Sequence, residues 1–205
     1  MTILSVNKTR ELMGAVCAHF LLGVVCLLPI FYFEVFSMRK KARRLAYAAI
    51  IAALYAVLTH MQNILLPGSA SMAIQFRASE ALCILAFFTP AAIYGLAVGC
   101  LVFNITSAAA LPLDFLVGSL ATLIACWYMW KTRNLTLKGY PLVGMLMPAL
   151  FNAILVGWEL TVYIGGGFLL NAVYVAIGEA AVLLTLGSAL YMAMKKRKLD
   201  QRLFK

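Results

Sequence analysis

Long apolar stretches, divided by turn residues more than by charge, make up most of the chain after residue 43. A helix needs about 20 apolar residues, within a range of about 17–25, to cross the hydrocarbon core of a bilayer. Proline and glycine separate the stretches, as at Pro67-Gly68 and Gly165-Gly166-Gly167. The pattern predicts six membrane-spanning helices, over residues 43–66, 73–88, 90–107, 112–131, 141–163 and 168–194.

Two of these helices, residues 73–88 and 90–107, are near the lower length limit, so we expect them to be tilted or partly embedded. Thr89-Pro90 provides a cap and a first-turn proline for the third helix. Pro148 is expected to kink the fifth helix. The predicted fold class is an all-α integral membrane protein, a bundle of six transmembrane helices.

The composition excludes the soluble classes of protein. Hydrophobic residues make up 64% of the 205 residues and charged residues 12%, and the mean hydropathy is +0.96. Soluble domains are about 45–50% apolar and about 25% charged. A soluble core of this length could not hide so much apolar surface, which excludes a soluble enzyme, a nucleic-acid-binding domain and a disordered chain.

The net charge of +10 comes from clustered cations. Fourteen of the seventeen Lys and Arg residues lie in three blocks, within residues 39–44, 131–138 and 195–205. Short basic segments beside membrane helices mark the cytoplasmic side. All three blocks are therefore expected to face the cytoplasm, which agrees with four helices between the first two blocks and two between the last two.

Residues 1–37 do not fit this pattern. Residues 12–36 are apolar enough to span a membrane, but a span here would put Lys8 and Arg10 outside, against the charge rule. A signal peptide, an extra helix and a chain that starts at Met38 stay open. The expected organisation is an apolar extension at 1–37, a six-helix substrate-binding membrane domain at 38–196, and a basic cytoplasmic tail at 197–205.

The sequence contains no motif for nucleotide, metal or acyl chemistry. It has no GxxxxGK[ST] loop for ATP phosphates, no GxSxG and no HExxH. The five cysteines lie singly in apolar stretches, as small buried hydrophobic residues do. We expect no catalytic residue, no metal and no cofactor, so any ATP hydrolysis would belong to partner subunits.

Small residues mark two helix-packing faces. Gly95 and Gly99 form a GxxxG motif, for which close packing within the bundle is the simpler interpretation. The first predicted helix carries a stripe of alanines: Ala48, Ala49, Ala52, Ala53 and Ala56. Small residues at this spacing let another helix approach closely, so the stripe serves either the bundle itself or a partner protein.

Polar side chains inside the apolar stretches are candidates for function, because a charge there costs about 2.5–3.5 kcal/mol on insertion scales. At about 1.5 Å per residue, the predicted topology puts them in the outer half of the membrane or at its midplane. They would form a cup open to the outside, not a path across. The candidate substrate-binding residues are Gln75, Arg77, Glu80, Asn104, Asp114, Asn152, Glu159, Asn171 and Glu179.

Such a cup suits a ligand that is rich in N–H donors and carries a positive charge. A guanine-like ring fits, because one carboxylate can accept from its N1–H and its exocyclic amine together. Aromatic residues available for stacking are Phe76, Trp158, Tyr163, Phe168 and Tyr174. The competing interpretation is an Arg77–Glu80 pair, at i and i+3 on one helix, that only stabilises the bundle.

Several short motifs occur along the chain in a fixed order. They are Gln75-Phe76-Arg77-Ala78-Ser79-Glu80-Ala81-Leu82, Gly99-Cys100 with Asn104, Asp114 with Gly118-Ser119-Leu120-Ala121-Thr122-Leu123, Asn152 with Val156-Gly157 and Glu159, and Gly178-Glu179. From Met38 to about Lys196 the chain resembles the QueT family, which are substrate-binding S components of energy-coupling-factor (ECF) transporters. The loop at residues 68–73 is longer and richer in alanine than the family pattern.

The resemblance implies a prokaryotic cell-membrane protein that captures a vitamin-like molecule from outside. It implies docking on a transmembrane T component through small residues of the first helix, with two cytoplasmic ATPases driving reorientation. QueT members are associated with salvage of queuosine precursors, chiefly 7-aminomethyl-7-deazaguanine, which agrees with an acidic cup. Neither the residues nor the resemblance settles which carboxylate meets which group of the ligand.

Two other functions stay open. A stand-alone proton- or ion-coupled carrier for a small cationic or purine-like solute would use Glu80, Glu159 or Glu179 as its relay. An intramembrane enzyme would need two facing acids for acid–base chemistry. Neighbouring genes for a T component and ATPases would favour the S component over the carrier.

Overall fold

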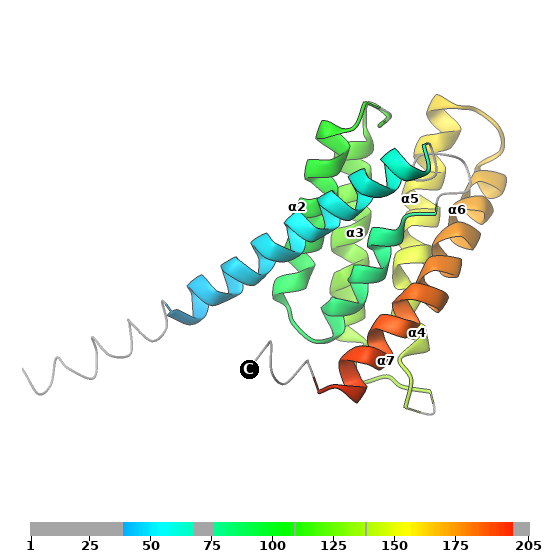
Figure 1. Ribbon diagram of the computed structural model, residues 1–205. Coiled ribbons are helices and arrows are strands. Elements are labelled where there is room, and N and C mark those ends of the chain that lie inside the picture. The colour runs from blue at the N-terminus through cyan, green and yellow to red at the C-terminus, as the bar shows by residue number, and fades with distance from the viewer. Residues whose placement is uncertain (1–38, 68–75, 109, 138, 199–205) are drawn as a thin grey trace, which may run out of the picture. The chain divides into compact units, whose positions relative to one another are not determined.

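The computed structural model describes residues 39–67, 76–108, 110–137 and 139–198 (Figure 1). The described part is helical, and its only β-type pairing is an isolated bridge between Leu137 and Tyr140. The chain divides into two units, residues 1–44 and residues 45–205. The paragraphs below concern the second unit, and the predicted extension at 1–37 lies outside the described residues.

Three of the predicted helices, over residues 43–66, 90–107 and 112–131, match the structure to within a few residues. After the helix Arg39–Leu65 come the 3-10 helix η1 (Ala78–Phe87), α2 (Ala91–Thr106) and α3 (Asp114–Lys131). Pro90 stands at the N-cap of α2, where its missing N–H leaves no hydrogen bond unmade.

The second predicted helix, residues 73–88, is wrong in both length and type. The structure has a ten-residue 3-10 helix that begins at Ala78. With three residues per turn, side chains three apart stand directly above one another. Leu82, Leu85 and Phe88 therefore form a partly exposed line, while most other side chains of η1 are buried. Apolar periodicity could not separate the two helix types in so short a segment.

The fifth predicted helix is interrupted close to Pro148, as expected. It consists of the single turn α4 (Leu142–Met145) followed by α5 (Met147–Tyr163). Pro148 has no N–H to donate to the carbonyl of Gly144, and its ring crowds that carbonyl. The break consequently comes at Leu146, and Pro148 sits in the first turn of α5.

The last predicted helix is continuous from Phe168 to Lys196 but not uniform. It consists of α6 (Phe168–Val182), the π-helical turn η2 (Leu183–Gly187) and α7 (Ser188–Lys196). Gly167 precedes it, after Gly165 and Gly166, whose φ angles of 88° and 81° favour glycine.

Three helices in the described residues are long and apolar enough to cross a membrane. They are Arg39–Leu65, Leu142–Tyr163 and Phe168–Lys196. Two further apolar helices, Ala78–Phe87 and Ala91–Thr106, are shorter. The described part of the chain is thus all-helical and contains three candidates for membrane-spanning helices.

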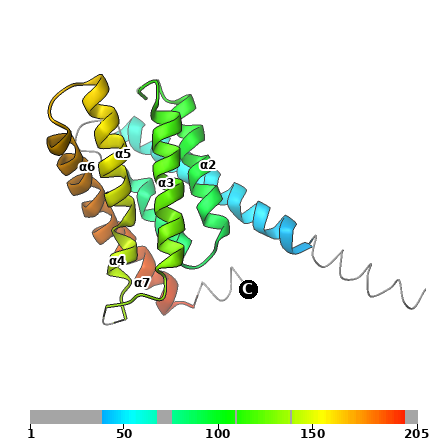
Figure 2. The ribbon, with the colours of Figure 1, turned by 180° about the vertical axis from the view of Figure 1, so that it is seen from behind.

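The helices α6, α5, α3 and α2 follow one another in a row (Figure 2). The 3-10 helix η1 packs against α2, α3 and the last helix, so it covers one side of this row (Figure 1). Buried apolar side chains from η1 and its neighbours, such as Ile84, Leu96 and Met129, form the main core. The row and η1 together enclose the polar residues described below.

The GxxxG motif of α2 packs against the first helix, within the bundle. A Cβ added at Gly95 would lie 2.6 Å from the carbonyl oxygen of Ala48, and one at Gly99 would lie 2.7 Å from that of Ala52. Only glycine allows this approach, because a Cβ essentially never sits that close to backbone. The simpler interpretation of the motif is confirmed.

The described residues of two basic blocks, 131–137 and 195–198, lie at the same end of the bundle. Gly144 stands beside Phe87 and Thr132, since an added Cβ would meet a Phe87 ring carbon at 2.7 Å and the Thr132 hydroxyl at 2.8 Å. The Lys195 ammonium lies 5.4 Å from the centre of the neighbouring Phe88 ring. The end of α3, the start of α4 and the end of α7 therefore meet at what we call the basic end.

Candidate functional site

Four candidate residues lie towards the end of the bundle opposite the basic end. Asn104 is in the last turn of α2, Asp114 begins α3, Glu159 is near the end of α5, and Asn171 is in the first turn of α6. Asp114 is half-buried and the other three are buried. Gln75, another candidate from the sequence, lies outside the described residues.

The 3-10 helix positions Arg77 and Glu80, the central pair of the predicted signature. Arg77 Nη1 and Glu80 Oε1 are 4.0 Å apart, and both side chains are buried. Glu80 also accepts a hydrogen bond from the hydroxyl of Tyr55, and its Oε2 lies 3.1 Å from the Cys83 thiol. Both carboxylate oxygens of Glu80 thus have protein partners.

The Arg77 guanidinium has several neighbours besides Glu80. Its central carbon lies 5.7 Å from the centre of the Phe103 ring, a cation–π distance. Its Nη1 is 3.8 Å from the Cys100 sulfur, and it interacts electrostatically with Glu179. Arg77 is therefore the cation at the centre of the buried polar residues.

Glu179 is held by Asn152 across the α5–α6 interface. The Asn152 amide Nδ2 donates to Glu179 Oε1 at 2.5 Å, and both side chains are buried. The other oxygens of the pair, Asn152 Oδ1 and Glu179 Oε2, have no hydrogen-bond partner among the described residues. One amide and one carboxylate oxygen are thus left as neighbouring acceptors.

Glu159 has no hydrogen-bond partner in the described part of the chain, although its side chain is fully buried. It follows Asn152 by seven residues on α5, two turns along the same face. Its strongest charged neighbour is Asp114, and Arg77 acts on it as well. Asp114 uses Oδ2 to accept the backbone N–H of Leu111 at 2.7 Å.

The two remaining asparagines have different surroundings. Asn104 Nδ2 donates to the Asp114 carbonyl at 2.7 Å, which ties α2 to the start of α3, and its Oδ1 is buried without a partner among the described residues. Asn171 Nδ2 donates to the Thr161 hydroxyl and to the Gly165 carbonyl, each at 3.1 Å. The structure thus shows Asn171 fixing the α5–α6 turn.

Five buried oxygens on α2, α5 and α6 are therefore acceptors without a partner in the described residues. They are Asn104 Oδ1, Asn152 Oδ1, Glu159 Oε1, Glu159 Oε2 and Glu179 Oε2. Buried polar atoms almost always have hydrogen bonds, and leaving one unmade costs about 1–3 kcal/mol, more for charged groups. A set of this size calls for a partner molecule that is rich in hydrogen-bond donors.

Four of the five aromatic residues proposed for stacking are exposed on the surface of the chain, and the fifth, Tyr174, is half-buried. Trp158, Phe168, Phe76 and Tyr163 are between 41% and 51% exposed on the surface of the chain. Adjacent positions on a helix point about 100° apart, so Trp158 faces outward because Glu159 faces inward. The sequence alone did not give the face of each aromatic residue.

Two aromatic residues that do contact the polar set were missed. Tyr55 is fully buried and donates to Glu80, and Phe103 is buried beside Arg77. Tyr55 lies between Ala52 and Ala56, on the buried face of the first helix. Its place within the alanine stripe was the signal that could have found it.

The structure divides the alanine stripe between two faces. Ala52 and Ala56 are buried, and Ala48 is half-buried against Gly95. Ala49 and Ala53 are exposed. Three of the five predicted docking alanines thus pack within the bundle, and Ala49 and Ala53 lie on its exposed face; that the stripe docks a partner stays a prediction.

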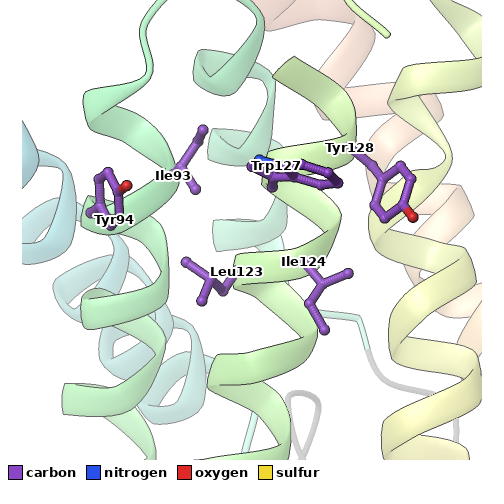
Figure 3. A pocket seen from close by; sticks show the side chains of 6 residues that line it. All are labelled: Ile93, Tyr94, Leu123, Ile124, Trp127 and Tyr128. Atoms are coloured by element: carbon purple, nitrogen blue, oxygen red, sulfur yellow. The ribbon is translucent and has the colours of Figure 1, made fainter. Parts of the chain in front are cut away.

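A separate pocket of about 340 Å³ lies between the start of α2 and the end of α3 (Figure 3). Its lining is apolar or aromatic: Ile93, Tyr94, Leu123, Ile124, Trp127 and Tyr128. None of the buried carboxylates or asparagines reaches it, so it is not the polar site. In the part of the chain that the structure describes, no group of three or more His, Cys, Asp or Glu residues could hold a metal ion.

The fold and the site define a class: a helical membrane protein whose bundle contains buried polar residues that are rich in hydrogen-bond acceptors. The family model described as QueT transporter matches residues 45–196, most of the 205-residue chain. The chain belongs to the QueT transporter family. No curated protein and no solved structure matches it.

Proposed function

We propose that this chain is the substrate-binding S component of an ECF-type importer, and that it takes up 7-aminomethyl-7-deazaguanine or a close relative. The observation that carries the proposal is the set of five buried acceptor oxygens that have no partner among the described residues, in a member of a transporter family. The guanine-like edge and the aminomethyl arm of this ligand supply the donors that such a set needs.

The membrane arrangement we propose has six crossings, with η1, α2 and α3 as the three shorter ones. Both ends of residues 38–196 face the cytoplasm, and 197–205 is a basic cytoplasmic tail. This orientation is supported by the two basic blocks that meet at one end of the bundle. The candidate site lies towards the other end, so it opens to the outside, where an importer meets its substrate.

ATP-driven transport would require partners, because the sequence has no loop that could hold ATP phosphates. A transmembrane T component and two cytoplasmic ATPases would drive reorientation and release. Of the predicted docking alanines, Ala49 and Ala53 are exposed, so a partner helix could approach closely there. The site would include Asn171 only at its rim, with the buried carboxylates deeper, and we keep Gln75 as a candidate from the sequence alone.

Uptake of radiolabelled 7-aminomethyl-7-deazaguanine in cells that lack their own queuosine synthesis and uptake tests this proposal. We expect uptake when the chain is expressed with a T component and both ATPases, and none when one ATPase carries a disabled P-loop. Uptake by this chain alone would instead favour a stand-alone carrier. No uptake with all partners present and assembled would overturn the proposed substrate.

A further inference from the structure

The apolar pocket between α2 and α3 lies beside the basic end of the bundle. Its inner lining is the buried Ile93 with the half-buried Leu123 and Ile124 (Figure 3). Trp127 and Tyr128 follow one turn later on α3 and are 46% and 41% exposed, so the pocket opens on the surface of the bundle. Around a membrane-spanning helix that surface meets lipid chains, which are as apolar as the lining itself.

The two aromatic residues mark the level at which the membrane meets water. The Tyr128 ring stacks on the Phe151 ring of α5, with their centres 5.1 Å apart, and it packs edge-on against Trp127 at 5.0 Å. Trp and Tyr are enriched at membrane interfaces, because their rings are apolar and carry a polar group. The pocket therefore begins at the depth of the lipid headgroups and continues towards the acyl chains.

A cation stands at the headgroup side of the pocket. The Lys131 ammonium lies 5.3 Å from the centre of the Trp127 ring, a cation–π distance, and Trp127 itself lines the pocket. Lys131 is exposed at the end of α3, where its charge can be reached by a ligand. An apolar pocket with a cation at its mouth matches a molecule that has an apolar chain and an anionic head.

The surrounding charge favours an anion as well. Arg133 and the cations of residues 195–198 belong to the same basic end. The acidic residues of the described part of the chain are Glu80, Asp114, Glu159 and Glu179. None of these four lies in the segments that form the basic end, the end of α3, the start of α4 and the end of α7. Anionic lipids are attracted to such basic segments, by about fivefold in affinity for each Lys or Arg.

We propose that this pocket binds one anionic phospholipid, with an acyl chain against Ile93, Leu123 and Ile124 and with the headgroup phosphate at Lys131. The volume of about 340 Å³ is near the lower limit of ligand pockets, about 300–1,000 Å³, so it suits part of one chain while the rest of the lipid stays in the bilayer. The site rests on the proposed membrane arrangement and is independent of the proposed substrate.

Native mass spectrometry of the purified full chain tests the headgroup, with phosphatidylglycerol and phosphatidylcholine that carry identical acyl chains. The wild-type chain should bind one phosphatidylglycerol at least fivefold more tightly than phosphatidylcholine. Lys131→Gln should weaken phosphatidylglycerol about fivefold and phosphatidylcholine less than twofold. Lys196→Gln, the matched control, removes the same charge from an exposed position on the last helix and should weaken phosphatidylglycerol less than twofold.

A filled pocket tests the acyl chain. Ile124→Trp places a large ring among the lining residues and should weaken both lipids about tenfold or more, because each methylene group that leaves an apolar site costs about fourfold in affinity. Leu116→Trp is the matched control, since Leu116 is 50% exposed and lies about two turns earlier on α3. It should leave the binding of both lipids unchanged.

Trp127 fluorescence gives a second reading, should Ile124→Trp not yield folded protein. Phosphatidylglycerol with brominated acyl chains should quench the wild-type chain more strongly than brominated phosphatidylcholine at the same mole fraction, and Trp127→Phe should remove that difference. Equal binding or equal quenching by the two lipids, or equal effects of Lys131→Gln and Lys196→Gln, would overturn the site. Unchanged lipid binding in Ile124→Trp would overturn it too, and a loss of uptake in the same variant would then assign the pocket to a partner helix.

Discussion

Tyr55→Phe removes one oxygen atom from the centre of the bundle, and its effect tests whether Glu80 is held by the protein. The Tyr55 hydroxyl donates to Glu80, and both side chains are completely buried. Phenylalanine keeps the ring and its packing, so the change isolates the hydrogen bond. Because Glu80 already has protein partners on both oxygens, the ligand should not depend on this bond directly.

The magnitude follows from the burial. A hydrogen bond to a charged group contributes about 1.5–3 kcal/mol, and no water can replace the lost donor in a fully buried site. In a chain of this length, 1 kcal/mol shifts the unfolding midpoint by about 2–4 °C, so Tyr55→Phe should lower the midpoint by about 3–12 °C. Affinity for the ligand, measured at a temperature where the variant is folded, should change less than threefold.

Thermal unfolding of the detergent-purified protein measures this effect, with Tyr94→Phe as the matched control. Tyr94 loses the same oxygen but is 66% exposed, and its midpoint should shift by less than about 1 °C, since exposed substitutions rarely change stability by more than about 0.5 kcal/mol. Equal midpoints for the two variants would refute the reasoning that the Tyr55–Glu80 bond anchors the polar site. A large loss of ligand affinity with unchanged stability would show instead that Tyr55 contacts the ligand.

Gly99→Leu should sharply reduce the yield of folded protein, because even a Cβ there would lie 2.7 Å from the first helix. Gly167→Ala, whose added Cβ meets nothing within 4 Å, should fold normally. Comparable yields of the two variants would contradict the close packing of α2 against the first helix. Ala53→Leu should block uptake in the assembled transporter but spare ligand binding. Ala189→Leu, a change at another exposed alanine, on the last helix, should leave both uptake and binding intact. Normal uptake by both variants would contradict the proposed docking face. A chain shortened to residues 38–205 should insert in the membrane and bind ligand as the full chain does, and failure to insert would show that residues 1–37 are needed.

Apolar length and turn residues were sufficient to predict most helices. The limits of α2 and α3 follow from Pro90 and from the loop before Asp114, both visible in the sequence. The 3-10 form of η1 was not predictable, because its apolar side chains are similar on the buried side and along the partly exposed line of Leu82, Leu85 and Phe88. The π-helical turn at Leu183–Gly187 likewise depends on packing, with Gly187 against Ile84, which the local sequence does not encode.

The candidate site shows a similar division. Charged residues in apolar stretches stand out by their cost, so Arg77, Glu80, Glu159 and Glu179 could be selected from the sequence alone. Which of them are satisfied by the protein depends on neighbours far along the chain, as with Tyr55 and Glu80. That distinction, which separates the supporting residues from those free to bind a ligand, required the structure.

The most direct test of the central claim is the choice between two rings that carry the same arm. Calorimetry would compare 7-aminomethyl-7-deazaguanine with 7-aminomethyl-7-deazaadenine, whose ring edge presents an acceptor where guanine has its N1–H. If buried carboxylate and amide oxygens read a donor edge, the guanine-type ligand should bind at one site per chain and at least tenfold more tightly. Equal affinity for the two rings, or no binding of the guanine-type ligand by folded protein, would contradict the account.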